Sequence, residues 1–224
     1  MALLSDLLGH AVLSGGVLAL GALGEVIAER AGVLNLGVEG LMSLGAVVAV
    51  MTVNATPHPW LGLLAAGLVG GLGASVLALS SVVLRANQVL CGVAITFLGL
   101  GLSSVIGRSV AGVPVSAVFE PVSIPVLSAI PVIGPAFFSQ NILVYLIYLV
   151  FPLMAHFWLF RTRSGLDLRA VGENPAAADA VGVPVMKYRA LAVIVGGVLA
   201  GVAGADLTLA GVPEIGRAHV GTTG

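Results

Sequence analysis

Long apolar runs separated by short polar breaks dominate the chain. A helix needs roughly 20 mostly apolar residues to cross the hydrocarbon core of a bilayer. Six segments meet this requirement, at residues 7–24, 34–53, 60–84, 89–106, 141–160 and 188–210. The pattern therefore predicts an all-α fold, a polytopic bundle of about six transmembrane helices.

The stretch between the fourth and fifth runs, residues 107–140, is apolar but rich in proline. Its prolines are Pro114, Pro121, Pro125, Pro131 and Pro135. Proline lacks the backbone N–H that a helix interior needs, so this density predicts that a regular helix does not form. We expect an external loop, or a segment that re-enters the membrane and is buried in protein there.

The main polar interruption is residues 161–189, which read RTRSGLDLRAVGENPAAADAVGVPVMKYR. Within it Asn174 is a good N-cap, Pro175 suits the first helical position, and Gly182 suits a left-handed position after the last turn. These signals predict a helix of about two turns. Such a helix is too short to be stable alone, so it must dock on something.

A second short helix is expected just upstream, from Ser164 to Val171, with Gly172 at its end. The alternative is that the whole loop lies on the membrane surface. A purely interfacial helix would separate its basic and aromatic faces more strongly than this segment does, so docking is the preferred interpretation.

Composition agrees with a membrane protein. Charged residues make up 8% of the chain, hydrophobic residues 58%, and the mean hydropathy is +1.13. Soluble domains carry about 25% charged residues, so this chain needs membrane lipid as its solvent. The net charge of −1 lacks the basic excess that is typical of nucleic-acid-binding proteins. The single cysteine, Cys91, lies in an apolar run and is expected to be a small packing residue.

Basic residues favour the cytoplasmic ends of membrane spans. If residues 161–189 are cytoplasmic and the spans alternate, seven basic residues lie inside: Arg30, Arg85, Arg161, Arg163, Arg169, Lys187 and Arg189. Arg108 and Arg217 then lie outside. This bias predicts an N-terminus on the outer side. Because the first basic residue is Arg30, a cleaved signal peptide is not expected.

Two polar clusters could take part in a solute path. Asn35 and Glu39 are four residues apart, so on a helix they would share one face. They could line the path or hold a broken helix in place; alternatively, Glu39 lies near the cytoplasmic end, bonded to backbone or paired with Arg30. Asn87 and Gln88 begin the fourth span, where capping and packing are preferred over a reach into the bundle.

Signals for catalysis are missing from the sequence. It contains no GxxxxGK[ST] phosphate loop, no GxSxG nucleophile elbow and no histidines at metal-ligand spacing. We therefore expect a protein that is not an enzyme and has no cofactor and no metal site. If ATP drives its activity, the ATPase must be a separate polypeptide.

Three segments, ERAGVLNLGVEG, LRANQVLCG and RTRSGLDLRAVGENPAAADAVGVPV, precede an AGVAGA span. Together they resemble the bacterial ABC transporter permeases of the branched-chain amino acid and simple-sugar class. The nucleoside and simple-sugar branch, whose members work with a Bmp-type binding lipoprotein, is the most similar. The resemblance runs from Leu18 to Leu209, and its most specific part is GLDLRAVGENPAAADAVG.

The resemblance implies a multi-pass permease subunit of an ATP-driven importer in the bacterial inner membrane, carrying a nucleoside or simple sugar. The implied partners are an ABC ATPase subunit, a second homologous permease subunit and an extracytoplasmic substrate-binding lipoprotein. Residues 161–189 would form the cytoplasmic coupling loop. Within it, the implied ATPase-coupling residues are Leu166, Arg169, Gly172, Glu173, Asn174, Pro175, Asp179 and Gly182.

The chain departs from this family in two places. Family members usually continue for another two or more spans after the sixth, so residues 1–213 are expected to be a permease domain that is incomplete at its C-terminus. Residues 214–224 are expected to be a non-native tail, because IGRAHV can be encoded by the start of a widely used sequencing adapter.

The second departure is Asp206, which stands where an aromatic or small residue is expected. It could pair across the bundle or lie near the outer interface.

Two other functions fit parts of the pattern. An ion-coupled secondary transporter or channel without an ATPase partner could use Asn35, Glu39 and Asp206 as its site. A structural membrane scaffold is also compatible with the apolar spans, but it would not need a capped docking helix.

Overall fold

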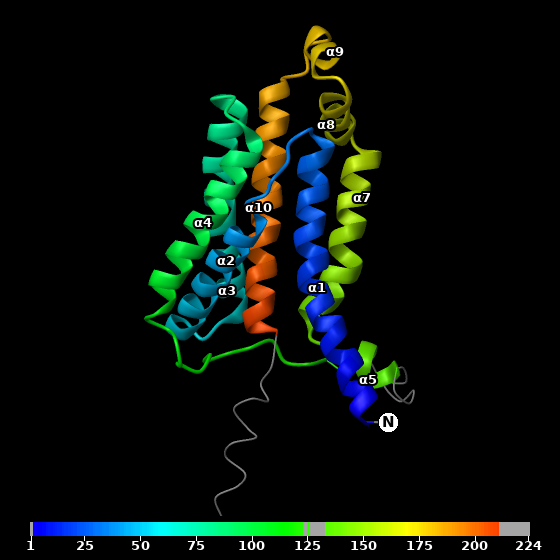
Figure 1. The fold of residues 1–224 in the computed structure, drawn as a ribbon. Coiled ribbons are helices and arrows are strands. Elements are labelled where there is room, and N and C mark those ends of the chain that lie inside the picture. The colour runs from blue at the N-terminus through cyan, green and yellow to red at the C-terminus, as the bar shows by residue number, and fades with distance from the viewer. Residues whose placement is uncertain (1, 123–124, 126–132, 211–224) are drawn as a thin grey trace, which may run out of the picture.

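The computed structural model describes residues 2–122, 125 and 133–210 of the chain. Within them, six helices are long and apolar enough to cross a membrane, as the sequence predicts. The architecture is an all-helical bundle, with the N-terminus at the end opposite α9 (Figure 1). The expected tail, residues 214–224, lies outside the described residues.

The first four spans are single helices or one helix with a π-helical extension. They are α1 (Ala2–Arg30), α2 (Val38–Ala55), α3 (Pro59–Ala78) with η1 (Leu79–Val83), and α4 (Gln88–Gly107). The fifth span joins α6 (Ile142–Tyr145), η3 (Leu146–Val150) and α7 (Phe151–Arg161). After it come α8 (Arg163–Glu173) and α9 (Pro175–Ala180), and α10 (Val185–Leu209) is the sixth span.

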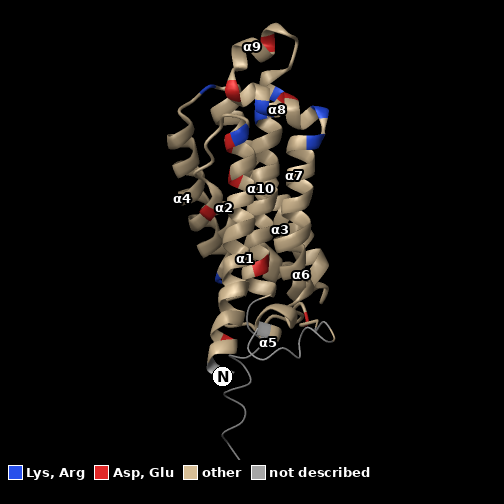
Figure 2. Cartoon of the chain, turned by 90° about the vertical axis from the view of Figure 1, so that its right-hand side faces the viewer, with Lys and Arg blue, Asp and Glu red and all other residues tan. Residues whose placement is uncertain are grey.

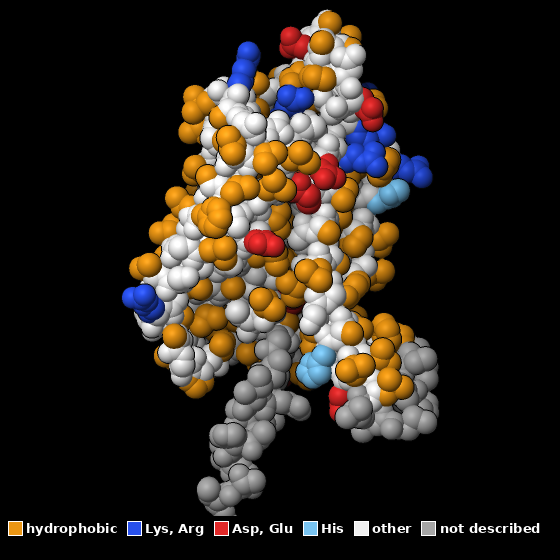
Figure 3. Space-filling model, in the orientation of Figure 1, with side chains coloured by type: hydrophobic (Ala, Val, Ile, Leu, Met, Phe, Trp, Pro, Cys, Tyr) orange, Lys and Arg blue, Asp and Glu red, His pale blue; other side chains and the backbone are white. Residues whose placement is uncertain are grey.

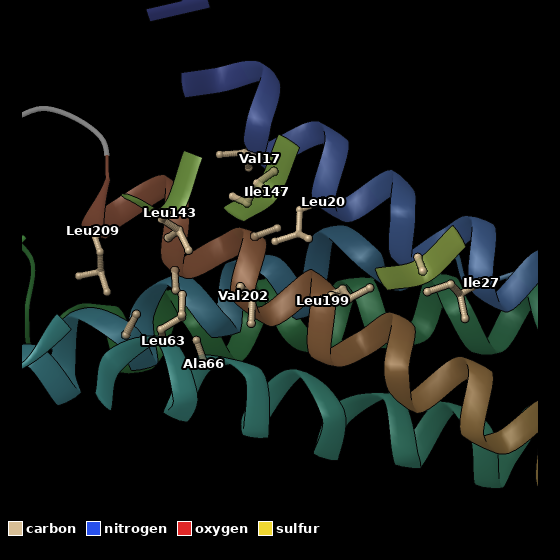
Figure 4. Close-up of a cluster of buried hydrophobic side chains, with 14 of the residues drawn as sticks. Val17, Leu20, Ile27, Leu63, Ala66, Leu143, Ile147, Leu199, Val202 and Leu209 are labelled. Carbon is tan, nitrogen blue, oxygen red and sulfur yellow. The ribbon is translucent and has the colours of Figure 1, made fainter. Parts of the chain in front are cut away.

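The last span, α10, occupies the centre of the bundle. It packs against α1, α2 and α3, whereas α4 lies at the periphery and packs mainly on α2 (Figure 1). Side chains from α1, η3 and α10 converge in the main apolar cluster, among them Leu20, Ile147 and Leu199 (Figure 4). The central position explains why so many residues of α10 are buried.

Glycine lets these helices approach closely. A Cβ on Gly24 would lie 2.7 Å from the Gly196 carbonyl oxygen, and one on Gly70 would lie 2.9 Å from the Gly201 Cα. In lipid there is no hydrophobic drive between helices, so such backbone contacts supply much of the packing energy. In the interface between α3 and α10, a Cβ added to Gly67 would lie 3.2 Å from a side-chain methyl carbon of Val202.

The first helix ends later than expected, which corrects the predicted second span. α1 runs to Arg30, and Gly32 at φ +76° then turns the chain out of the helix. Residues 31–37 are therefore not helical, and α2 begins at Val38 rather than near residue 34. The prediction that Asn35 and Glu39 share one helical face is wrong, because Asn35 lies in this connection.

The described part of the proline-rich connection, residues 107–122, 125 and 133–140, is mostly irregular, as predicted, and its first part crosses the end of the bundle opposite α9 (Figure 1). The Phe119 N–H donates to the Leu209 carbonyl at 3.0 Å, and the Phe119 ring meets Trp60 edge-on at 5.0 Å between centroids. One short helix, α5 (Ile133–Phe138), does form there and contains Pro135. The prediction of no regular helix is wrong for this segment, because a single turn tolerates proline near its start.

Charge separates along the bundle. Most Lys and Arg residues, and many Asp and Glu residues, lie at the end that carries α8 and α9 (Figure 2). The long sides of the molecule are mainly hydrophobic (Figure 3), with Leu68, Phe97 and Met154 among the exposed residues. An apolar flank of this kind suits contact with lipid.

Candidate functional site

The polar segment between the fifth and sixth spans folds into α8 and α9 at the charged end of the bundle. Thr162 caps α8, since its hydroxyl accepts the Gly165 N–H at 3.1 Å. Leu168 and Val171 are fully buried and anchor α8 against the bundle. The second predicted helix is confirmed, although it extends one residue past Gly172 to Glu173.

Three contacts tie α8 to the transmembrane helices. The Arg169 guanidinium lies over the Phe160 ring at 4.9 Å from its centroid, and Arg30 lies over the same ring at 5.8 Å. Gly172 packs directly on the carbonyl group of Arg30 at the end of α1, where an added Cβ would lie 2.9 Å from the carbonyl carbon. The Tyr188 hydroxyl on α10 donates to Asp167 at 2.8 Å. Movement of α8 would therefore be passed to α1, α7 and α10.

The capped short helix predicted at residues 174–182 is confirmed. The Asn174 side chain accepts the Ala177 N–H at 3.0 Å, and Pro175 occupies the first turn of α9. Gly182 has φ +86°, and its N–H donates to the Asp179 carbonyl at 2.9 Å. These local bonds define both ends of a six-residue helix.

The predicted coupling residues divide into a half-buried set and an exposed set. Arg169, Gly172 and Pro175 are half-buried. Exposed are Leu166, Glu173, Asn174, Asp179 and Gly182. Val181 at the end of α9 retains 80% of its surface exposed although it is apolar. A partly apolar helix tip presented beyond the bundle is suited to a protein partner.

A groove of about 720 Å³ separates α9 from the ends of the third and fourth spans. We call it the α9 groove; residues that line it include Arg85, Gln88, Pro175, Asp179 and Lys187. It brings two predicted coupling residues, Pro175 and Asp179, together with Gln88, one of the candidates for a solute path. The lining carries both acidic and basic side chains, so it can take polar groups of either sign.

The four predicted path residues do not form one cluster. Asn35 is buried and its side chain accepts the Gly37 N–H at 3.0 Å, while its own N–H donates to Glu25 at 2.9 Å. Asn87 caps α4 by accepting the Val89 N–H at 3.0 Å, as predicted. Gln88 accepts the Leu34 N–H at 3.1 Å. Three of the four thus hold the 31–37 connection and the start of α4 in place.

Glu39 differs from these three residues because it is exposed on the first turn of α2.

Glu25 is a polar residue of the bundle that is not among the candidates predicted from the sequence. Its second carboxylate oxygen is buried and has no hydrogen-bond partner among the described residues, and the same is true of the Asn35 side-chain nitrogen. The sequence signal for Glu25 is an acidic residue at the end of a long apolar run. Glu25 lies inside the bundle because α1 continues to Arg30, and the apolar run alone does not show this.

Comparisons with known proteins agree with this architecture. Residues 7–216 match the family model described as the branched-chain amino acid transport system permease component. A Haloferax volcanii protein, provisionally named a glucose ABC transporter permease protein, is 43% identical over 216 residues, which are 94% of this chain and 64% of the relative. No solved structure matches the chain.

Two further relatives carry nucleoside names. The nucleoside ABC transporter permease protein NupC of Lactococcus lactis is 38% identical over 194 residues, covering 82% of this chain and 61% of the relative. The guanosine ABC transporter permease protein NupQ of Bacillus subtilis is 38% identical over 197 residues, covering 84% and 62%. The chain thus spans less than two thirds of the length of the curated relatives it matches.

The family match covers nearly the whole chain and coincides with the six apolar helices. The family model favours a permease over an ion-coupled secondary transporter, and the names of the relatives describe transport permeases rather than enzymes. The chain is a multi-pass membrane protein that belongs to the permease component family of the branched-chain amino acid transport system.

Proposed function

We propose that the chain is part of the membrane-spanning permease subunit of an ATP-driven importer for a nucleoside or simple sugar. The observation that carries the proposal is α9, a capped helix with an exposed apolar tip at the charged end of the bundle. The names of three relatives support the solute class, because they specify glucose, nucleosides and guanosine. The sugar ring is the common chemical element of these solutes.

The proposed partners follow from this role. An ABC ATPase subunit would receive α9, a second homologous permease subunit would complete the path, and an extracytoplasmic binding lipoprotein would deliver the solute. The α9 end would face the cytoplasm, which places the N-terminus outside in a bacterial inner membrane. Support comes from the basic residues at that end, with Arg85, Lys187 and Arg189 around the α9 groove.

Within the coupling loop, the residues have separate proposed roles. Leu166, Glu173 and Asp179 would contact the ATPase directly, since they are exposed. Arg169 and Gly172 would transmit movement of the ATPase to α7 and α1, because Arg169 packs on Phe160 of α7 and Gly172 packs on Arg30 of α1. The remaining candidates, Asn174, Pro175 and Gly182, would keep the docking helix in shape.

The path residues are proposed to act less directly. Asn35, Asn87 and Gln88 would hold the inner end of the path in place through their bonds to the connection and to α4. Glu39 is free to face a path because its side chain is exposed on α2. If Glu39 contributes to the solute path, Glu39→Gln should lower solute uptake without changing how much ATPase subunit associates with the permease.

Changing Val181 to aspartate is expected to reduce co-purification of the ATPase subunit by roughly tenfold or more, because a charge would replace an apolar contact at the docking tip. The measurement is a pull-down of the full-length permease from native membranes in mild detergent, with partners identified by mass spectrometry. Val113→Asp is the matched control, since Val113 is 50% exposed at the opposite end of the bundle.

Unchanged ATPase recovery with Val181→Asp would contradict docking through α9. A wild-type protein that is recovered alone, and that moves solute into liposomes without ATP, would contradict the importer proposal as a whole. Loss of the ATPase with both variants would show that an exposed charge acts nonspecifically, and it too would count against the assignment.

A further inference from the structure

Asp206 is a buried carboxylate whose oxygens have no hydrogen-bond partner in the part of the chain that the structure describes. It lies in the last turns of α10, and only 1% of its surface is exposed. Leaving an ionisable group unpaired inside a membrane bundle is costly, so such residues usually serve a ligand or a partner group.

A small pocket lies beside this carboxylate, between α1 and α10. Its volume is about 130 Å³, and it is lined by His10, Leu13, Ser14, Val17, Asp206, Leu207 and Ala210. His10 and Ser14 are exposed on α1, so the pocket combines one buried acceptor with two side chains that can donate hydrogen bonds. It lies at the end of the bundle opposite α9.

The nearest aromatic hydroxyl is already engaged. Tyr148 of η3 donates its hydroxyl proton to the Val12 carbonyl at 2.9 Å, so that proton does not serve Asp206. Glycines on α1 make room for both side chains. An added Cβ on Gly15 would lie 2.7 Å from the Tyr148 hydroxyl, and one on Gly16 would lie 3.7 Å from an Asp206 oxygen.

The chemistry of the pocket suits hydroxyl groups. A carboxylate offers two acceptor oxygens side by side, which can take two O–H donors from adjacent carbons of one ring. The described residues contain no group of three His, Cys, Asp or Glu that could hold a metal ion. The small volume fits the hydroxylated edge of a sugar ring better than a whole nucleoside.

We propose that Asp206 accepts hydrogen bonds from adjacent hydroxyl groups of the solute as it passes the end of the bundle opposite α9. The inference rests on the proposed function, since only an imported sugar or nucleoside would bring these hydroxyls. Asp206 is then a specificity-determining residue for the sugar moiety, and His10 and Ser14 are the groups beside it that can bond to the same ring.

The test uses the full-length permease reconstituted with its ATPase, partner permease and binding protein. Uptake of guanosine is compared with uptake of 2′,3′-dideoxyguanosine, and uptake of glucose with that of 2-deoxyglucose. Asp206→Asn keeps the shape but loses the charge and one acceptor, so uptake of the hydroxylated solute should fall roughly ten- to hundredfold. Uptake of the deoxygenated analogue should change little, so discrimination between the two is lost.

A stability measurement separates this role from a structural one. If Asp206 serves a ligand, the unliganded Asp206→Asn protein in detergent should unfold at the same or a higher temperature, because an unpaired buried charge has been removed. If Asp206 instead pairs with a cation elsewhere in the complex, the variant should lower the stability of the complex and reduce uptake of every solute equally. That result would overturn the proposal.

Asp6→Asn is the matched control, because Asp6 is an exposed carboxylate on α1 near the same end of the bundle. It should leave uptake and discrimination unchanged. Unaltered discrimination in Asp206→Asn, with ATP-driven uptake intact, would overturn the inference and leave the proposed function standing. Wild-type protein that shows no ATP-driven uptake of either solute pair would overturn both.

Discussion

Replacing Gly201 with valine is expected to prevent α10 from seating against α3, and to abolish recovery of folded protein. An added Cβ at this position would lie 2.9 Å from the Ala66 carbonyl carbon and 3.2 Å from the Gly70 Cα. These are backbone atoms of a packed helix, so no side-chain rotation relieves the overlap. The free energy of unfolding should fall by at least about 3 kcal/mol, the upper part of the usual range for overpacking.

The control for this substitution is Gly101→Val in α4. Apart from the neighbouring backbone of α4 itself, no atom of the described residues lies within 4 Å of a Cβ added to Gly101, so valine there enters open space. Thermal unfolding and size-exclusion chromatography in detergent should show a monodisperse protein for Gly101→Val and an aggregated or absent one for Gly201→Val. Equal behaviour of the two variants would contradict the central position assigned to α10.

Replacing Gly172 with leucine is expected to uncouple the loop from the bundle. The added side chain would press on the Arg30 carbonyl group and on the Gly32 amide nitrogen, 3.3 Å from the new Cβ. α8 would then separate from the end of α1 while the apolar core stays intact. ATP-driven uptake by the complete complex should fall by roughly tenfold or more, with little change in the thermal unfolding of the subunit.

Ala170→Leu supplies the matched comparison, because Ala170 is exposed on the same helix. It should leave uptake close to the wild-type level. Uptake that is equally reduced in both variants would indicate a general effect of a larger side chain on α8. Uptake that is unaffected in Gly172→Leu would contradict a role for the contact between α8 and α1 in coupling.

The sequence predicted those features that depend on local chemistry. The ends of α9 follow from Asn174 and Gly182, because capping bonds join residues two to four positions apart. Asn87 was assigned as a cap of the fourth span for the same reason. The spans themselves follow from hydropathy, since the bilayer requires a minimum apolar length.

Features that depend on contacts between distant segments were not predictable in this way. Hydropathy predicts a helix at Asn35, whereas the structure places Asn35 in the connection after α1. The end of α1 at Arg30 depends on Gly32 and on packing against α8, and hydropathy contains no information about either. The contact of Gly172 with Arg30 joins residues far apart in the chain. The pocket beside Asp206 likewise combines α1 with α10, so the sequence showed the carboxylate but not its surroundings.

The central claim, that α9 is a cytoplasmic helix covered by an ATPase, can be tested with one cysteine. Cys91 is the single cysteine of these 224 residues. With Cys91 and any further cysteine of the full-length permease replaced by alanine, Ala177→Cys places a single thiol on the exposed face of α9. Labelling with a membrane-impermeant maleimide is followed in inside-out membrane vesicles, before and after ATPase subunits are stripped and added back. The account predicts labelling of the stripped vesicles and protection when the ATPase returns; labelling only in right-side-out vesicles, or labelling that the ATPase does not change, would contradict it.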